Sequence, residues 1–326
     1  MTEHLKALVP KLANHRIMVI GDVILDEYLI GRAQRLSREA PIPILEFESR
    51  QYIPGGAANP AVNIVALNSE AVVIGIVGTD DAATQLNEQL DERGIDVTGL
   101  VIDSSKPTTL KTRILAQMGL RYPQQIARID TLSRQPISNT IEAGLMHRIQ
   151  NHVSRSQAVL ISDYQNGLLN SHTVSLIKQV VNLPIIVDTQ GALDKYHGVD
   201  VIKCNAEDAI SFLNTRLTNN VDFAEAASEL ANRLMVKLAV VITRGADGVT
   251  IATQDDTAHI GAPKISDVYD TVGAGDTWIA VLTLAMVGGA TLADAAMLAN
   301  YASGIVVRHV GNYTPSADEL LHALST

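Results

Sequence analysis

The sequence predicts an α/β fold in which helices cover both faces of a mostly parallel sheet. Short apolar runs alternate along the chain with stretches of helical periodicity, which is the pattern of strand–helix–strand units. Several runs end in Asp, Gly or a small hydroxyl residue, as strands do when they lead into a site at their carboxyl ends. The apolar residues are mainly Ala, Val, Ile and Leu, with three Phe and one Trp among 326 residues, which suits buried strands and Ala-rich helices.

The strands are predicted from the apolar runs, and the helices from the segments between them. We expect buried strands at 16–22, 71–77, 158–162, 185–188 and 238–243. We expect helices at 4–14, 57–67, 82–93, 138–153, 171–181, 222–236, 276–287 and 291–308. No repeat, low-complexity tract or linker interrupts this pattern, so residues 1–326 are predicted to form a single domain.

Two segments depart from the alternation and predict a lid. Residues 28–54 and 97–130 contain strand-like stretches without long helices between them, at 42–47, 99–102, 109–117 and 125–129. Such stretches predict a small antiparallel sheet that projects from the main domain and covers a site at the strand ends. Loops with an ordinary meander topology are the alternative interpretation.

Charge and cysteine content argue against several classes of function. The chain has 35 acidic and 25 basic residues, a net charge of −10, which argues against a nucleic-acid surface. Cys204 is the single cysteine, so neither a disulfide framework nor a zinc cluster is expected. The uncharged run of 17 residues at 277–293 falls short of a membrane span and predicts a buried helix. We expect a cytoplasmic protein without nucleic-acid or membrane partners.

The strongest functional signal is the turn Asp270-Thr-Val-Gly273-Ala-Gly275-Asp276, which directly precedes that uncharged run. The two glycines allow a tight turn whose N–H groups point outward, and the following helix adds the positive end of its dipole. This arrangement suits the charge of a phosphoryl group in transfer, and the Asp276 carboxylate can accept the proton of an attacking hydroxyl. A plain helix N-cap is the alternative. The P-loop and dinucleotide-binding patterns are absent, which argues against a nicotinamide enzyme.

Two further clusters predict contacts with a polyol. The segment 54–59, Pro-Gly-Gly-Ala-Ala-Asn, opens a helix, and its glycines allow a ligand to approach the backbone. In the segment 21–26, two carboxylates at a strand end can accept hydrogen bonds from sugar hydroxyls. Helix-opening turns and capping carboxylates without any ligand are the alternatives. The candidate substrate contacts in these clusters are Asp22, Gly55, Gly56 and Asn59.

Three basic residues in the predicted lid are candidates for binding an anionic group of the substrate. They are Lys111, Arg113 and Arg128, and the first two share one face of a strand by period-two alternation. Solvated strand edges also favour lysine, so an ordinary surface role is the alternative. The nine histidines show no metal-ligand spacing.

Taken in this order, the three clusters resemble the ribokinase/PfkB family of sugar kinases over essentially the whole chain. The turn that ends at Asp276 matches the family signature D-T-x-G-A-G-D. The resemblance implies a ribokinase-like three-layer α/β/α sandwich with a small β-sheet lid, and an ATP-dependent carbohydrate kinase. The segments most similar to the heptose-7-phosphate kinases of the ADP-heptose pathway are 21–28, 35–43, 54–59, 109–113, 125–130 and 162–167. That branch phosphorylates the anomeric hydroxyl of a sugar 7-phosphate. The resemblance therefore implies that the lid cations bind the phosphate group of the substrate.

The resemblance also implies roles for individual residues. Asp276 is similar to the catalytic base, and the amides of the anion hole match Gly273, Ala274 and Gly275. The sugar side is implied for Asp22, Gly56, Asn59 and Asp163. The nucleotide side is implied for Asn205, Thr243, Gly245, Gly248 and Asn300. Mg²⁺ is expected to bridge the ATP phosphates while keeping mostly water ligands.

Three segments depart from the family pattern. The family's N-x-x-E, which organises magnesium water, reads Asn205-Ala-Glu207-Asp208, so Asp208 or the adjacent Glu207 takes the acidic role. The usual Asp-Pro-Lys or Asp-Pro-Arg reads Asp188-Thr-Gln, which removes a cation near the nucleotide phosphates. The segment 118–123 is longer than is typical of the heptose branch. No nucleotidyltransferase half accompanies these residues, so we expect no second activity.

These observations leave alternatives to a heptose-phosphate kinase. A kinase for another sugar or a nucleoside shares the same turn and lid. A sugar- or nucleotide-binding regulator with weak catalysis explains the altered 188–190 and 205–208 segments, because a fold does not fix a function. A homodimer is expected from the family and from an exposed lid edge, and the sequence leaves open whether K⁺ assists.

Overall fold

Strand β1 (Arg16–Gly21) separates the two apolar layers of the protein. The computed structural model describes residues 2–117 and 123–325. Along β1, Ile17 and Val19 pack into one layer, whereas Met18 and Ile20 pack into the other, because successive strand side chains point to opposite faces. The sheet is therefore buried on both faces, as its continuous apolar runs predict.

The main sheet has nine strands within the described residues. In spatial order they are β13 (Thr257–Ile260), β12 (Val249–Ala252), β11 (Ala239–Thr243), β10 (Val201–Asn205), β9 (Ile185–Thr189), β8 (Ala158–Asp163), β1, β4 (Glu70–Val77) and β5 (Leu100–Ile102). The strands from β11 to β5 pair in parallel, and β12 and β13 extend one edge antiparallel. The parallel strands bring their carboxyl ends to the same edge, where a site is expected.

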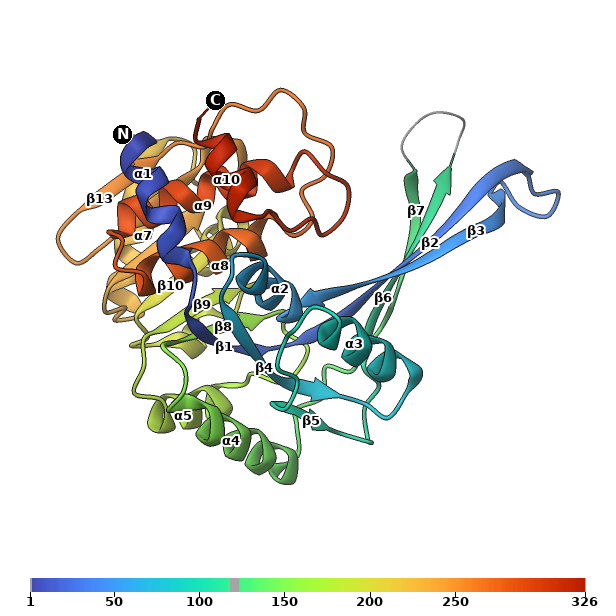
Figure 1. Cartoon of the computed structure of the whole chain (residues 1–326), viewed down its shortest axis with the longest axis horizontal. Helices are drawn as coiled ribbons and strands as arrows, with labels where there is room; N and C mark the ends of the chain where they lie inside the picture. The colour runs from blue at the N-terminus through green and yellow to red at the C-terminus, as the bar shows by residue number, and fades with distance from the viewer. Residues whose placement is uncertain (1, 118–122, 326) are drawn as a thin grey trace.

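Helices cover both faces of this sheet (Figure 1). One layer consists of α1 (Thr2–Leu8), α2 (Ala58–Ala66), α3 (Asp81–Asp91), α8 (Ala274–Val287), α9 (Leu292–Val306) and α10 (Ala317–Ala323). The other consists of α4 (Asn139–Val153), α5 (Ser171–Val180), α6 (Ala206–Leu213) and α7 (Asn220–Arg233). Short 3₁₀ turns are η1 (Val9–Leu12), η2 (Leu193–Tyr196) and η3 (Gly245–Asp247). The predicted three-layer α/β/α sandwich is confirmed.

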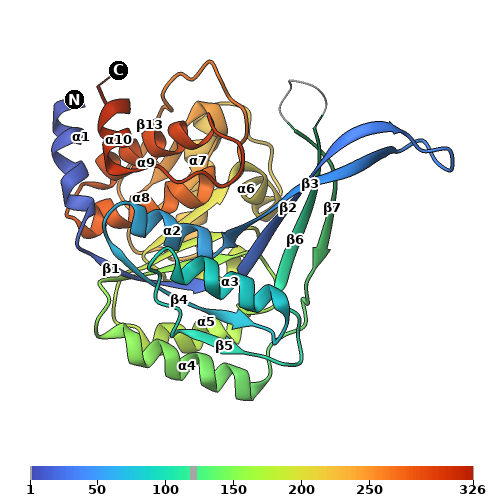
Figure 2. The ribbon, with the colours of Figure 1, turned by 45° about the vertical axis from the view of Figure 1, so that its right-hand side comes forward.

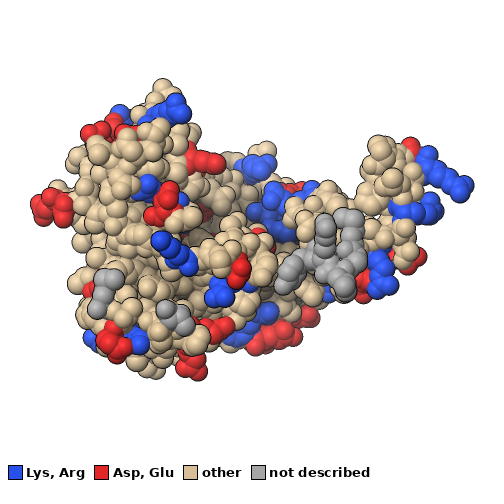
Figure 3. Space-filling view, turned by 90° about the horizontal axis from the view of Figure 1, so that it is seen from above, with Lys and Arg blue, Asp and Glu red and all other residues tan. Residues whose placement is uncertain are grey.

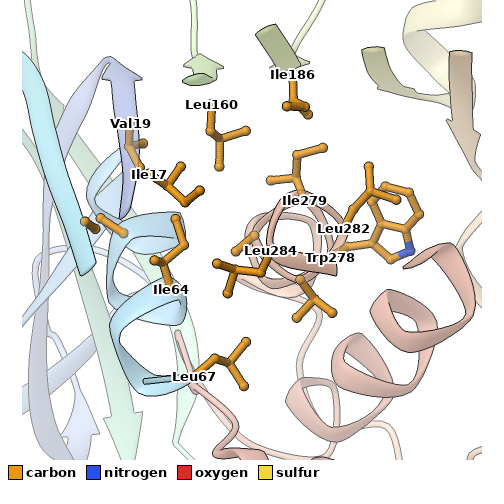
Figure 4. Close-up of a cluster of buried hydrophobic side chains, with 14 of the residues drawn as sticks. Ile17, Val19, Ile64, Leu67, Leu160, Ile186, Trp278, Ile279, Leu282 and Leu284 are labelled. Atoms are coloured by element: carbon orange, nitrogen blue, oxygen red, sulfur yellow. The ribbon is translucent and has the colours of Figure 1, made fainter. Parts of the chain in front are cut away.

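Helix α8 is the buried helix that the uncharged run predicts. Figure 4 shows Ile279, Leu282 and Leu284 of α8 among side chains of the sheet and of α2. Asp276 and the residues up to Ala285 are all buried. This packing holds Asp276, in the first turn of α8, at the carboxyl edge of the sheet. Among the helices described here, none combines the length and the apolar character needed to cross a bilayer.

The lid is a second sheet, with four strands in the described ranges. Their order is β3 (Pro43–Gly56), β2 (Val23–Leu36), β6 (Thr109–Gln117) and β7 (Gln124–Thr131). The lid projects from the main domain as a long twisted ribbon (Figures 1 and 2). Its base is buried at Leu25, whereas Phe47, farther out on β3, is 68 % exposed. Strands β3 and β7 are the two edges of the lid sheet. The expected homodimer stays a prediction, which analytical ultracentrifugation can test.

Several details of the predicted lid are wrong. β2 begins before residue 28 and β3 ends after residue 54. The pairing of β2 with β6 is parallel, so the sheet is mixed rather than antiparallel. Residues 100–102 form β5, which pairs with β4 of the main sheet because α3 returns the chain to that sheet as in a βαβ unit. Residues 118–122 lie outside the described residues, so the expected longer segment at 118–123 is untested.

Periodicity also fails to predict five elements, namely β10, β12, β13, α6 and α10. Each strand among them is short, and its apolar run is interrupted by a polar residue, as by Lys203 in β10. Strand β10 matters most for the site, because its carboxyl end lies between those of β9 and β11.

Candidate active site

The turn before α8 adopts the conformation that its glycines allow. Gly273 caps the helix with a φ of 79°, in the left-handed region. A Cβ at this residue would lie 2.9 Å from Oδ1 of Asn312 and 3.0 Å from Nδ2 of Asn59. Both the backbone conformation and the close approach of the two asparagines therefore require glycine here.

The amides of this turn form the predicted anion-binding surface only in part. The N–H group of Ala274 donates to the carbonyl oxygen of Thr271 over 3.3 Å, so it is already engaged. The N–H groups of Gly275 and Asp276 lie in the first turn of α8, where no intrahelical acceptor is available to them. Together with the positive end of the helix dipole, they can hold an anionic oxygen.

The carboxylate of Asp276 lies between two hydrogen-bond donors and is only 7 % exposed. Asn59 donates to its Oδ2 and the hydroxyl of Tyr164 donates to its Oδ1, each over 2.8 Å. Burial raises the pKa of Asp276 to about 6, the nearby Asp188 raises it as well, and the two donors oppose the rise. A carboxylate with this pKa is mostly ionised at neutral pH and can still accept a proton.

A polar cavity of about 200 Å³ opens beside Asp276. Its walls come from the carboxyl ends of β8, β9 and β10, from residues that follow β8 and β9, and from the turn before α8. They include Tyr164, Asp188, Lys203, Asn205, Gly273 and Gly275. Figure 3 shows a hollow between the main domain and the base of the lid, with Lys and Arg side chains gathered on its lid side. The candidate base therefore borders a space that a small polar ligand can enter.

An ion pair that the sequence did not predict forms part of the cavity wall. The ammonium of Lys203 lies 2.8 Å from both carboxylate oxygens of Asp188. The two residues are partners in register on the neighbouring parallel strands β10 and β9. The next strand of the sheet therefore places a cation beside Asp188. The available signal was a lysine two residues before Asn205, within a short run whose apolar pattern that lysine interrupts.

The residues predicted to organise magnesium water cap helix α6. Asn205 accepts from the N–H of Asp208 over 2.8 Å, and Asp208 accepts from the N–H of Asn205 over 3.4 Å, which is a reciprocal capping box. Glu207 is exposed. Among the described residues, no group of three or more His, Cys, Asp or Glu side chains could hold a metal ion. The roles of Glu207 and Asp208 in organising magnesium water stay predictions.

The predicted nucleotide residues lie in two places. Thr243 ends β11 and donates to a β10 carbonyl over 3.4 Å, and the turn after it has positive φ angles at Gly245 (58°) and Gly248 (84°). Asn300 is buried in α9, accepts from the indole N–H of Trp278, and donates to two carbonyls of the 260–261 segment. Every polar group of the Asn300 side chain therefore binds the protein, and its contact with a nucleotide stays a prediction.

Two predicted sugar-side carboxylates support the loop that carries Tyr164. Asp22 accepts from the backbone N–H of Tyr164 over 2.9 Å and from that of Asn166 over 3.1 Å, and burial raises the pKa of Asp22 to about 6. Asp163 lines the cavity, but its carboxylate accepts from Lys195, Tyr196 and Gln165. These contacts give both residues a structural role, and their contacts with a sugar stay predictions.

The glycines predicted at the helix-opening turn lie against Asp26. A Cβ at Gly55 would lie 2.3 Å from Oδ2 of Asp26, and Gly56 has a φ of 56°. Asp26 also forms a buried ion pair with Arg113 and accepts from Nδ2 of Asn312 over 3.0 Å. Asp26 therefore connects the base of the lid to Asn312, which lies beside the turn at 270–276.

The three predicted lid cations have different surroundings. Arg113 forms an ion pair with Asp26. Arg128 lies opposite Arg113 on the neighbouring strand β7, is exposed, and forms an ion pair with Asp130 of β7. The ammonium of Lys111 lies 5.2 Å from the ring centroid of Tyr164, and burial lowers its pKa. Within the described residues, Lys111 has no carboxylate partner at ion-pair distance. Lys111 is therefore the lid cation that an incoming anion can approach.

The sequence matches known carbohydrate kinases. The model of the "pfkB family carbohydrate kinase" matches residues 14–319. A curated relative, the bifunctional protein HldE of Hyphomonas neptunium, is 37 % identical over 329 residues, covering 100 % of this chain and 66 % of the relative. The HldE of Geobacter sulfurreducens is 36 % identical over 315 residues, covering 94 % and 62 %. The chain thus spans slightly less than two thirds of the length of these relatives.

Solved structures share the fold at low sequence identity. Phosphofructokinase-2 from Escherichia coli, in complex with substrates and products, has a TM-score of 0.79 at 19 % identity, covering 96 % of this chain and 99 % of that chain. Ribokinase from Arabidopsis thaliana, complexed with ribose and ATP, has a TM-score of 0.73 at 18 % identity with the same coverage. These likenesses show the fold alone. Because the family match extends from residue 14 to residue 319, the chain belongs to the pfkB family of carbohydrate kinases.

Proposed function

We propose that this chain transfers the γ-phosphoryl group of ATP to a hydroxyl of a phosphorylated sugar. The first candidate is the anomeric hydroxyl of a heptose 7-phosphate. The observation that carries the proposal is the position of Asp276, at the start of α8 and on the wall of a polar cavity, with its carboxylate held by Asn59 and Tyr164. The similarity to HldE proteins and the resemblance of the segments around 21–28 and 162–167 to heptose-7-phosphate kinases support the choice of substrate.

Asp276 acts as the general base in this proposal. Each carboxylate oxygen has two lone-pair positions, so a substrate hydroxyl can donate to Asp276 while Asn59 and Tyr164 stay bound. Asp276 takes the hydroxyl proton as the acceptor oxygen forms its bond to the γ-phosphorus. The bond from that phosphorus to the β–γ bridging oxygen breaks, and ADP leaves with the electron pair.

The turn at 273–276 stabilises the charge of the phosphoryl group in transfer. The N–H groups of Gly275 and Asp276 and the dipole of the 14-residue helix α8 are fixed before the substrate arrives, so no reorganisation is needed. Mg²⁺, when bound, would neutralise charge on the nucleotide phosphates. Asn205, which lines the cavity, and Asp208 in its capping box are the residues that would hold water ligands of that ion.

Lys111 binds the phosphate that the sugar already carries. It comes from the lid and lies against the ring of Tyr164, which lines the cavity of the main domain beside Asp276. A charge-assisted hydrogen bond contributes roughly 1.5–3 kcal/mol. We therefore expect Lys111→Met to raise KM for a phosphorylated sugar by about 10- to 100-fold.

The test is ADP release from ATP and Mg²⁺ with a panel of sugars and sugar phosphates. Wild type is compared with Asp276→Asn, with Lys111→Met, and with the control Arg32→Met, which removes a charge from the outer part of the same lid. Turnover with heptose 7-phosphate that needs Asp276, together with a KM effect of Lys111 limited to phosphorylated sugars, supports the proposal. Equal KM losses for neutral sugars would indicate a kinase of another sugar or nucleoside.

A binding regulator on the same fold is the second candidate, because Asp163 and Asp208 use their carboxylates within the protein. ATP binding without turnover on any sugar, unchanged by Asp276→Ala, would favour the regulator.

A further inference from the structure

We propose that Asn63 and Thr277 position the side-chain amide of Asn59, which in turn holds the carboxylate of Asp276. This inference rests on the proposed function, because it takes Asp276 as the base. Asn63 lies on α2 and Thr277 on α8, and neither is among the described residues that line the cavity beside Asp276. Both therefore act on the base through Asn59 and do not touch a substrate.

Four buried side chains form a continuous series of hydrogen bonds between α2 and α8. The hydroxyl of Thr277 donates to Oδ1 of Asn63 over 2.7 Å. Nδ2 of Asn63 donates to the backbone carbonyl oxygen of Asn59 over 3.0 Å and to its Oδ1 over 3.3 Å. Nδ2 of Asn59 then donates to Oδ2 of Asp276 over 2.8 Å. None of the four residues is more than 7 % exposed, so these bonds are shielded from bulk water.

The acceptors at two points of this series determine its direction. The backbone carbonyl oxygen of Asn59 can only accept, so Asn63 must turn its NH₂ group towards it and its Oδ1 towards Thr277. The same NH₂ group meets the Asn59 side chain, which must therefore present its Oδ1 there and its own NH₂ group to Asp276. A reversed Asn59 amide would place an oxygen against the carboxylate. The network thus allows one orientation of Asn59 in which every contact joins a donor to an acceptor.

Helix geometry and close packing keep the Asn59 amide in this place. Asn59 and Asn63 are one helical turn apart on α2, so their side chains lie side by side. On the other side, a Cβ at Gly273 would lie 3.0 Å from Nδ2 of Asn59, so the turn before α8 closes on the amide. Loss of the Asn63 contact therefore removes the one side-chain hydrogen bond that holds Oδ1 of Asn59 among the described residues.

The pKa of Asp276 depends on the Asn59 amide, because the groups that face the carboxylate act in opposite directions. Burial has the largest effect on the pKa of Asp276 and raises it, and the nearby Asp188 raises it further. Hydrogen bonds from Asn59 and Tyr164 lower it, as does the charge of Lys203. A misdirected Asn59 amide leaves the buried carboxylate with one donor fewer, so the pKa of Asp276 rises.

A purely structural network between α2 and α8 is the competing explanation, and the pKa of Asp276 separates the two. We would measure this pKa by NMR in protein with isotope-labelled aspartate carboxyl groups, without substrate, and identify the Asp276 signal by its absence from Asp276→Asn. Asn63→Leu should raise the pKa by about one unit, and Thr277→Val by about half as much because it acts one step farther away. A lower melting temperature with an unchanged pKa in both variants overturns the proposal.

Two further variants are matched controls. Thr283→Val makes the same change in the same helix, because Thr283 is also fully buried and donates to the carbonyl oxygen of Ile279 over 2.7 Å. It should lose a similar amount of stability and leave the pKa of Asp276 unchanged. Thr277→Ser keeps the hydroxyl and should keep the wild-type pKa. An equal shift in Thr283→Val, or a shift in Thr277→Ser as large as in Thr277→Val, would contradict the proposal.

The outcomes for the two proposals are distinguishable, because the NMR titration needs no turnover. In the active enzyme, the acidic limb of kcat against pH should move upward with the pKa, while KM for ATP stays unchanged. If the pKa stays in place and wild type phosphorylates a sugar, the positioning role falls and the proposed kinase stands. If the pKa shifts as expected and wild type turns over no sugar, the network still holds the carboxylate and the proposed kinase falls.

Discussion

Tyr164 donates its hydroxyl hydrogen to Oδ1 of Asp276 over 2.8 Å. The ring of the same residue contacts the lid, because the ammonium of Lys111 lies 5.2 Å from the ring centroid. Asp22 accepts from the backbone N–H of Tyr164 and holds it at the end of β8. One side chain thus contacts the candidate base and the candidate phosphate-binding cation of the lid.

Tyr164→Phe should shift the pH dependence of turnover upward. The hydroxyl of Tyr164 stabilises the ionised form of Asp276 and so opposes the rise of its pKa to about 6. Without that donor the pKa of Asp276 rises, and the acidic limb of kcat against pH moves to higher pH. The loss of activity is then larger at pH 6 than at pH 8. Tyr301→Phe in α9 is the control, and an acidic limb that stays in place would contradict the assigned contact.

Asp276→Asn should abolish most activity and stabilise the fold at alkaline pH. Removal of a general base typically costs about 10²- to 10⁴-fold in kcat. Burial raises the pKa of Asp276 from 3.8 to about 6, and at about 1.4 kcal/mol per unit its ionisation costs roughly 3 kcal/mol of folding free energy.

The pH dependence of this stability difference has a defined sign. Between about pH 4 and pH 6 the folded state holds a proton on Asp276 that the unfolded state has released, so wild-type stability falls as the pH rises. Urea unfolding should therefore show the variant more stable than wild type at pH 8 and nearly equal to it below pH 4. A variant less stable than wild type at pH 8 would contradict this prediction. It would show that the hydrogen bonds lost with the amide cost more free energy than removal of the buried charge returns.

The two glycines of the turn should respond differently to alanine. Gly273→Ala places an alanine at a backbone φ of 79° and its methyl group against Asn59 and Asn312. We therefore expect the free energy of unfolding to fall by about 1–2 kcal/mol and the activity to fall as well. Gly275→Ala meets only Nζ of Lys203, at 3.0 Å and at the far end of a long side chain, and alanine suits a helix better than glycine. Gly275→Ala should therefore keep most of its stability, and its kcat should fall because the methyl group lies beside the amides proposed to hold the phosphoryl group. Thermal unfolding and ADP release of both variants check this contrast.

The sequence by itself determined the layers and the turn that precedes α8. Alternation along β1 assigns Ile17 and Met18 to opposite faces before any tertiary contact is known, because side chains point alternately along a strand. The turn at 270–276 is local as well, since its two glycines and the following apolar run define a helix start whatever surrounds it. The strongest functional prediction therefore concerned residues that are neighbours in the chain.

Only the tertiary structure decided which distant side chains act together. Lys203 meets Asp188 because β9 and β10 pair in parallel with those two residues in register, and no pattern within the five-residue strand β10 reveals this. Tyr164 and Asp276 are 112 residues apart, and Asn59 and Asp276 are 217 apart. Strand register and helix packing depend on the summed burial of whole elements, so they assign partners that local sequence cannot specify.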